Sequence, residues 1–255
     1  MNSAMPWILL LGLACGMIDA SKVSYHQMSD HQQLSQQGSQ RNHSHLHTTE
    51  FQSLLSDVVT IMDSQAEESG LYFELNRELS SFFNVIALGG AGTCLTRTGG
   101  ACAGSPGPSA LSEAQTKCSG KKVILWAGVN DVKVANGGGA GYTGYLQGFI
   151  NGIRQACPGT EIVVIQPPLR GGPPPPGYEP EWPAASEAAM NAALDQGCSW
   201  AHGEADVLAV CNTNRFFALS DFRPPAGRAA HFGSSASGRA AFKDAIIAAA
   251  KEKLL

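Results

Sequence analysis

Five short apolar runs constrain this chain more than any other feature of its sequence. They are "VVTIM" (Val58–Met62), "NVIALGG", "VILWA" (Val123–Ala127), "EIVVIQPP" and "ADVLAVC". Segments with apolar residues at helical spacing separate them, such as "LYFELNRELSSFF" and "GYLQGFINGIRQACPG". Continuous apolar strands that alternate with helices are typical of a parallel sheet covered by helices on both faces. The sequence therefore predicts an α/β fold, a three-layer α/β/α sandwich around a parallel five-stranded sheet.

The N-terminal region divides into two segments that we expect to lie outside this sheet. The apolar run Trp7–Met17 has the length of a signal-peptide core, and Ala20 fits a cleavage site, although no Lys or Arg precedes the run. Residues 21–52 are rich in Gln, Ser and His, and they cannot bury enough apolar surface to offset the entropy of ordering. We therefore expect a signal peptide at 1–20, a flexible tail at 21–52 and one folded domain at 53–255.

Charge and apolar content exclude two classes of partner. The formal net charge is -4 and the Lys and Arg residues form no cluster, so we expect no nucleic acid partner. The run at Trp7–Met17 is too short to span a bilayer, and we expect no membrane span. The sequence does not indicate an oligomeric state.

Cysteine usage predicts disulfides and an extracytoplasmic location. The chain has seven cysteines, and loss of Cys15 with the signal peptide leaves an even number. An even number in a secreted chain indicates up to three disulfides, with buried free thiols as the alternative. No pair has the C-x-x-C spacing of a zinc site, and we expect neither a metal nor a cofactor. The remaining cysteines are Cys94, Cys102, Cys118, Cys157, Cys198 and Cys211.

Polar and glycine-rich turns follow three of the predicted strands. They are Asp63-Ser64, the glycines between Gly89 and Gly92, and Gly128-Val129-Asn130-Asp131. Parallel sheets bind their ligands beyond the carboxyl ends of the strands. We therefore expect these three turns to meet at one edge of the sheet and to form a site there.

The same turns resemble the sequence blocks of the SGNH (GDSL) hydrolases, which are esterases and lipases on a flavodoxin-like sheet. Met62-Asp63-Ser64 is similar to the Gly-Asp-Ser of that family, and "VIALGGAGT" is similar to its second block, with Gly92 as the functional glycine. Gly128-Val129-Asn130-Asp131 matches the third block, G-x-N-D. The last block is a histidine before the C-terminal helix, and "HFGSSASGRAAFKDAI" places it at His231. The resemblance covers about residues 55–255.

The resemblance implies a role for each matched residue. Ser64 is the expected nucleophile, and a serine hydroxyl needs a neighbouring base to take its proton. Beyond the N-terminal region the only histidines are His202 and His231; His231 fits better, because it precedes a helix in a loop, whereas His202 follows one. The backbone N–H groups of Ser64 and Gly92 and the side-chain amide of Asn130 are the expected oxyanion hole.

Two positions depart from the family pattern. Met62 replaces the family's glycine, which we expect to narrow the turn, and Arg228 stands where the family has an acid three residues before the histidine. Asp221 is the nearest upstream carboxylate, and we expect it to orient His231. The alternative is a backbone carbonyl in that role, which leaves a Ser-His dyad. The proline-rich loop Pro167–Pro183 either shapes a binding cleft or is a surface loop without function.

Together these observations predict a secreted, metal-independent serine hydrolase that cleaves carboxylic esters through an acyl-enzyme intermediate. The expected partner is a small-molecule or carbohydrate ester. The resemblance to the family implies acetyl groups on carbohydrate as the substrate. Two alternatives remain open at this point. One is a non-catalytic ligand-binding protein on the same fold, suggested by the missing acid at Arg228 and by Met62 in place of glycine. The other is a sugar O-acetyltransferase, which passes the same acyl group to a different acceptor.

Overall fold

A five-stranded parallel sheet forms the centre of the molecule, with strand order β2-β1-β3-β4-β5. The computed structural model describes residues 55–90, 93–97, 109–132, 141–169, 184–222 and 231–255. Each predicted apolar run forms one strand, which confirms the predicted α/β fold. The strands are β1 (Asp57–Asp63), β2 (Asn84–Gly90), β3 (Lys122–Trp126), β4 (Ile162–Ile165) and β5 (Val207–Val210).

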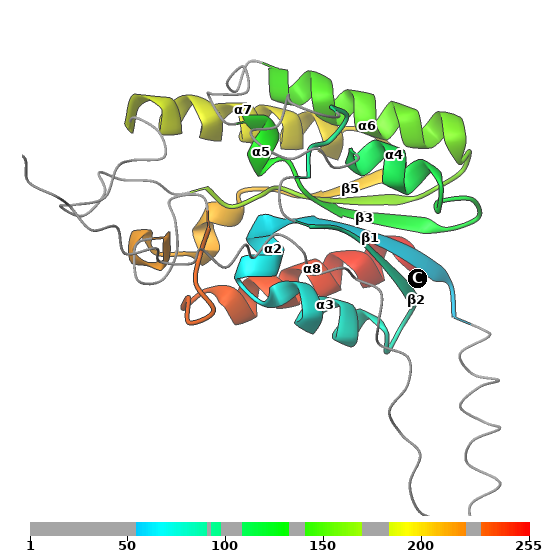
Figure 1. Cartoon of the computed structure of the whole chain (residues 1–255), viewed down its shortest axis with the longest axis horizontal. Helices are drawn as coiled ribbons and strands as arrows, with labels where there is room; N and C mark the ends of the chain where they lie inside the picture. Colours follow the sequence, from blue (N-terminus) through cyan, green and yellow to red (C-terminus); the bar gives the residue numbers. More distant parts are fainter. Residues whose placement is uncertain (1–54, 91–92, 98–108, 133–140, 170–183, 223–230) are drawn as a thin grey trace, which may run out of the picture. The chain divides into compact units, whose positions relative to one another are not determined.

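Helices cover both faces of the sheet and complete the three predicted layers (Figure 1). One face carries α4 (Ala110–Gln115), α5 (Val129–Val132), α6 (Tyr142–Ala156) and α7 (Ala184–His202). The other face carries α2 (Ser64–Glu68), α3 (Leu71–Leu79) and α8 (Arg239–Leu254). Two short 3-10 helices, η3 (Thr213–Phe216) and η4 (Leu219–Phe222), follow β5.

Alternation along β1 shows why apolar residues occupy both faces of this strand. Val59 and Ile61 belong to the core on the α6 face, whereas Val58 and Met62 belong to the core on the α8 face. All four side chains are fully buried. A strand covered on both faces has no solvent-facing side on which polar residues alternate.

The strand register brings the carboxyl ends of β1, β2 and β3 to the same edge. Met62 lies opposite Gly89 of β2 and Trp126 of β3, and Asp63 lies opposite Gly90. The turns that follow these strands therefore leave the sheet side by side. This is the arrangement that the sequence predicts for a ligand site.

An aromatic cluster packs between the sheet and α8. Its rings contact one another: the ring centroids of Phe217 and Phe232 are 4.3 Å apart, and those of Trp126 and Phe242 are 5.1 Å apart. Phe232 also stacks on Trp126 at an interplanar angle of 7°. Because Phe232 directly follows His231 in the chain, this cluster anchors the histidine loop on the sheet. The cluster consists of Trp126, Phe217, Phe222, Phe232 and Phe242.

Disulfides link elements on the α6 face. One joins Cys118, after α4, to Cys157 at the end of α6, and another joins Cys198 in α7 to Cys211 after β5. Cys94 is disulfide-bonded as well. The prediction of disulfides is confirmed for these cysteines.

The helix boundaries differ from the sequence patterns in two respects. The pattern at Leu71–Phe83 predicts a longer helix than α3, which ends at Leu79 because Ser80 closes the last turn. The short helices α4 and α5 carry too few residues to show a period.

None of the described helices is both long and apolar enough to cross a membrane. The segments at 1–20 and 21–52 lie outside the described residues, so that division of the chain stays a prediction.

Packing of the aromatic cluster predicts a large effect of Phe242→Ala. Phe242 is fully buried against Trp126, Phe217 and Phe232, so truncation leaves a cavity and lowers the free energy of unfolding by about 3–5 kcal/mol. Urea unfolding of the purified protein measures this change. Phe73→Ala is the matched control, because Phe73 is 67% exposed and its loss should change stability little. Equal losses in both variants would contradict this packing.

Candidate active site

Ser64 is the first residue of α2, at the carboxyl end of β1. Asp63 precedes it as the N-cap, and its Oδ1 accepts a hydrogen bond of 3.0 Å from the N–H of Gln65. A side-chain cap of this kind satisfies a backbone donor at the helix start and fixes the direction in which the chain leaves the strand. Ser64 is consequently held at the sheet edge, and it is 7% exposed.

The second oxygen of Asp63 connects this turn to the one after β3. Asp63 Oδ2 accepts a hydrogen bond of 3.3 Å from the N–H of Val129 in α5. The preceding Gly128 has a φ of +124°, and a Cβ there would lie 2.7 Å from the ring of Tyr142. Only glycine meets both conditions without strain. The G-x-N-D motif thus begins with a glycine for reasons of space and backbone angle.

Asn130 and Asp131 connect the third turn to the segment that follows β2. Asn130 Nδ2 donates a hydrogen bond of 3.1 Å to the carbonyl of Thr93. Asp131 Oδ2 accepts one of 2.9 Å from the N–H of Leu95, and Arg97 lies 3.4 Å from Asp131 Oδ1. The three turns therefore form one hydrogen-bonded unit. The expected oxyanion residue Gly92 lies outside the described residues.

His231 reaches this unit from the far end of the chain. Its Nε2 lies 2.8 Å from Ser64 Oγ, although the two residues are 167 positions apart in sequence. Both side chains are buried. With the proton on Nδ1, Nε2 accepts the hydrogen bond of the hydroxyl, and this geometry allows the imidazole to take the proton of Ser64.

The carboxylate of Asp221 holds the loop that carries His231. Its Oδ2 accepts hydrogen bonds from the N–H of Ala218 and the hydroxyl of Ser237, and its Oδ1 accepts one from the N–H of Ser237. The backbone carbonyl of Asp221 accepts a further bond from Gly233. These contacts span His231 from both sides in sequence. The expected role of Asp221 as the acid that orients the imidazole stays a prediction.

A carboxylate that the sequence reasoning did not single out lies beside the other ring nitrogen. Glu68 Oε2 is 3.8 Å from Nδ1 of His231. Glu68 is the last residue of α2, four positions after Ser64, and residues at this spacing share a helix face. The sequence "DSQAEESG" shows the four-residue spacing of Ser64 and Glu68. This spacing indicates a role for Glu68 only when the position of the imidazole is known.

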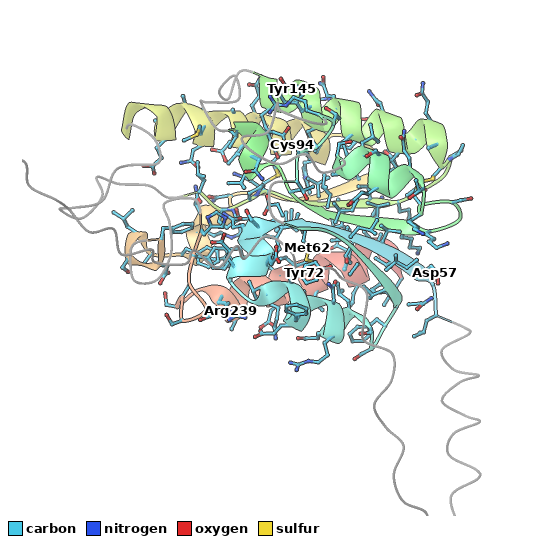
Figure 2. The ribbon with its side chains drawn as sticks, in the orientation of Figure 1. Asp57, Met62, Tyr72, Cys94, Tyr145 and Arg239 are labelled. Carbon is cyan, nitrogen blue, oxygen red and sulfur yellow. A yellow bond between two sulfur atoms is a disulfide. The ribbon has the colours of Figure 1, made fainter. Side chains whose placement is uncertain are left out.

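Two further sequence expectations concern Met62 and Arg228. The side chain of Met62 is fully buried and belongs to the core on the α8 face, where Tyr72 packs against that core (Figure 2). Met62 therefore fills the core, and its expected effect on the turn stays a prediction. Arg228 lies outside the described residues, as does the part of the Pro167–Pro183 loop from residue 170 onward.

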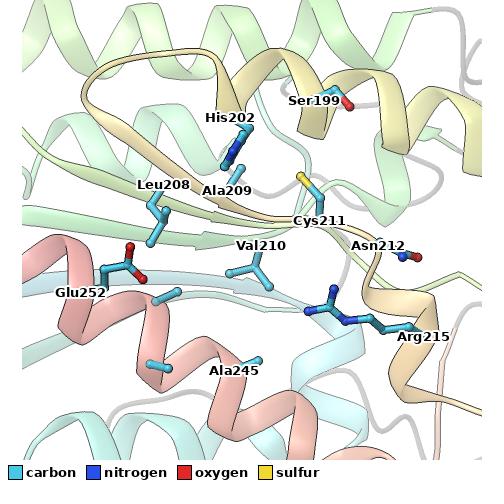
Figure 3. Close-up of a pocket in the computed structure, with 12 residues that line it drawn as sticks. Ser199, His202, Leu208, Ala209, Val210, Cys211, Asn212, Arg215, Ala245 and Glu252 are labelled. Carbon is cyan, nitrogen blue, oxygen red and sulfur yellow. The ribbon is translucent and has the colours of Figure 1, made fainter.

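The alternative base, His202, lies elsewhere. It is exposed at the end of α7 and lines a hollow of about 630 Å³ between α7, β5 and α8 (Figure 3). Arg215 and Glu252 also line this hollow, whereas Ser64 does not. The structure thus brings His231, and not His202, to the serine.

Burial dominates the electrostatics of the two aspartates in the turns. It raises the pKa of Asp63 to about 7, against the lowering effect of the Gln65 and Val129 amides. Burial also raises the pKa of Asp131 to about 6, although Arg97 opposes the change. Both carboxylates accept backbone hydrogen bonds that fix the turns. Within the described ranges, no group of three His, Cys, Asp or Glu side chains could hold a metal ion.

Comparison with known proteins gives a family match over most of this domain. The sequence model of the GDSL-like lipase/acylhydrolase family matches residues 63–241. This range contains Ser64, Asn130 and His231. No curated protein sequence is significantly similar to the chain.

Solved structures share the fold at low sequence identity. Est24, a carbohydrate acetylesterase from Sinorhizobium meliloti, is 12% identical with a TM-score of 0.54, covering 76% of this chain and 99% of its own. A family 3 carbohydrate esterase from Talaromyces cellulolyticus is 16% identical with a TM-score of 0.52, covering 78% and 98%. An active-site mutant of a family two carbohydrate esterase from Clostridium thermocellum is 15% identical with a TM-score of 0.52, covering 78% of this chain and only 64% of its own.

The raised pKa of Asp63 predicts a pH dependence of stability. The unfolded chain loses this proton near pH 4, whereas the folded protein keeps it to about pH 7, so the folded state binds more protons between these values. The free energy of unfolding contributed by Asp63 therefore falls as the pH rises from 4 to 7. The variant Asp63→Asn, which does not titrate, should show a shallower fall, by up to about 1.4 kcal/mol per pH unit.

Urea unfolding of both proteins at several pH values between 4 and 8 measures this difference. Asp244→Asn is the control, because Asp244 lies exposed on α8. Parallel curves for wild type and Asp63→Asn would show that Asp63 titrates normally in the folded protein.

Proposed function

Because the chain belongs to the GDSL-like lipase/acylhydrolase family, we propose that it is a serine esterase that cleaves carboxylic esters through an acyl-enzyme intermediate. The observation that carries the proposal is the distance of 2.8 Å between Ser64 Oγ and His231 Nε2. A serine and an imidazole in hydrogen-bonding contact form the minimal unit of nucleophilic acyl transfer. Their position at the carboxyl edge of a parallel sheet is also where such folds bind substrates.

The proposed reaction has two steps. Ser64 Oγ attacks the ester carbonyl while Nε2 of His231 takes the hydroxyl proton, and the imidazolium returns that proton to the departing alcohol. Water then attacks the acyl group on Ser64, with His231 taking its proton. Collapse of this second intermediate releases the carboxylic acid and returns the proton to Ser64 Oγ.

The developing negative charge on the carbonyl oxygen needs fixed donors. We assign this role to the N–H groups of Ser64 and Gly92 and to Asn130 Nδ2. Ser64 suits it because the first N–H groups of a helix have no partner within the helix. Asn130 suits it because its amide is buried at the same sheet edge and tied to Thr93.

Acetyl groups on carbohydrate are the proposed substrate class. Est24 is described as a carbohydrate acetylesterase and the Talaromyces cellulolyticus protein as a carbohydrate esterase, and both share this fold. The proposed location is extracytoplasmic, with 1–20 as a signal peptide and 53–255 as the catalytic domain. The disulfides Cys118–Cys157 and Cys198–Cys211 support that location, because disulfides persist in oxidising compartments.

Ser64→Ala tests the nucleophile directly. The variant should hydrolyse p-nitrophenyl acetate at least about a thousand-fold more slowly than the wild type, because it lacks the proposed nucleophile. Ser199→Ala, at an exposed position of α7, is the matched control and should retain full activity. Release of acetate from acetylated xylan, measured in the same preparations, tests the substrate class. Equal rates for wild type and Ser64→Ala would instead favour a non-catalytic binding protein.

Asn130→Ala tests the oxyanion hole. Removal of one such donor should lower kcat by about a hundred- to a thousand-fold, with a smaller change in KM, because the bond strengthens in the transition state. Steady-state kinetics give both constants, and circular dichroism checks that the variant is folded. Asn151→Ala, at an exposed position of α6, is the control. A variant whose KM rises while its kcat stays unchanged would assign Asn130 to substrate binding alone.

A further inference from the structure

The imidazole of His231 lies along one turn of α2. Ser64 begins this helix and Glu68 ends it, so the two side chains are one turn apart on the same face. Nε2 of the ring lies 2.8 Å from the hydroxyl of Ser64, and Nδ1 lies 3.8 Å from Oε2 of Glu68. A single five-residue helix therefore presents a hydroxyl to one ring nitrogen and a carboxylate to the other.

We propose that Glu68 is the positioning residue that orients His231, in place of the acid that the family carries three residues before its histidine. That position is Arg228 in this chain. The inference rests on the proposed function, because orientation of the imidazole matters for catalysis only if His231 is the base. It assigns the nucleophile and the orienting acid to the same helix.

A carboxylate beside Nδ1 has two effects on the imidazole. It favours the tautomer with the proton on Nδ1, which leaves the lone pair of Nε2 facing the hydroxyl of Ser64. It also stabilises the imidazolium that forms when the serine proton is transferred. Both effects increase the rate of acyl transfer without contact between Glu68 and the substrate.

The distance of 3.8 Å is longer than a hydrogen bond but within the range of a strong charge interaction. The side chain of Glu68 is 44% exposed, so water screens its charge and leaves space for a change of rotamer towards Nδ1. Catalytic hydrogen bonds often tighten only in the complex with substrate. We therefore expect a moderate effect on the pKa of His231, of about one unit.

Asp221 and Arg239, two charged residues of the described segments that flank His231, have partners of their own. Both carboxylate oxygens of Asp221 accept hydrogen bonds from Ala218 and Ser237. Arg239 of α8 binds the carbonyl of Ser234 and the carboxylate of Glu74.

Two more carboxylates of the same region have contacts with other groups. Asp63 accepts hydrogen bonds from the N–H groups of Gln65 and Val129. Glu67, next to Glu68 in α2, places its Oε2 beside Gly90 of β2. Glu67 therefore carries the same charge on the same helix in a different direction, and it provides a matched control.

The decisive measurement is the pKa of His231, from the imidazole ¹⁵N chemical shifts of the full chain, with His231→Gln for assignment. Glu68→Gln removes the negative charge while keeping the side-chain size, so the protonated imidazole loses stabilisation and the pKa should fall by about one unit. Glu67→Gln should leave the pKa within a few tenths of a unit of wild type. This readout does not depend on ester hydrolysis.

Kinetics on the same variants test the consequence for catalysis. Glu68→Gln should lower kcat by about ten-fold or more with little change in KM, and the acidic limb of the kcat/KM profile should move to lower pH with the pKa of His231. Glu67→Gln should match the wild type in all three quantities.

The outcomes separate this inference from the proposed function. An unchanged pKa of His231 in Glu68→Gln overturns the inference, and a fall in Asp221→Asn alone would assign the orienting role to Asp221. A lowered pKa in Glu68→Gln without any ester hydrolysis by the wild type would uphold the contact and refute the esterase. A lowered pKa in both glutamate variants would indicate a general field of α2 and overturn the specific role of Glu68.

Discussion

The carboxylate of Asp63 accepts one hydrogen bond from each of two turns that carry the site. Through Gln65 it fixes the start of α2, and hence Ser64; through Val129 it fixes α5, and hence Asn130. The parallel register of β1 and β3 places these amides within reach of one side chain. Complete burial of this carboxylate opposes its ionisation and raises its pKa to about 7, so the hydrogen bonds that fix the turns form around a group that burial favours in its neutral form.

His231 is positioned by different means. Its loop is fixed by packing, since Phe232 stacks on Trp126 and Phe217. Asp221 also fixes the loop, because its carboxylate accepts hydrogen bonds from Ala218 and Ser237. Trp126 is the last residue of β3, so the sheet that carries the turns also supports the ring of Phe232, the residue after the histidine. Hydrogen bonds of Asp63 thus hold the serine side of the site, whereas apolar packing and the hydrogen bonds of Asp221 together hold the histidine side.

The strands were predictable because fully buried strands show as continuous apolar runs, and the turns after them because parallel strands end at a common edge. The pairing of Ser64 with His231 followed from the order of the motifs. The contact between Glu68 and His231 could not be predicted from the motifs, because it depends on how far the histidine loop extends along α2. Asp221 illustrates the same limit: its sequence position suggested a partner for the imidazole, whereas its contacts are with the loop backbone and Ser237. The helices α4 and α5 are shorter than the span over which periodicity can be recognised.

The separation of 167 residues between Ser64 and His231 has a consequence for how the site comes into being. Ser64 lies in the first strand-helix unit of the described chain, and His231 precedes the last helix. A growing or truncated polypeptide that stops before His231 contains the hydroxyl without the imidazole, and one that stops between His231 and α8 lacks Phe242, which packs on the residue after the histidine. The contact between Ser64 and His231 therefore joins an early and a late segment of the chain, and it forms only after both have been synthesised.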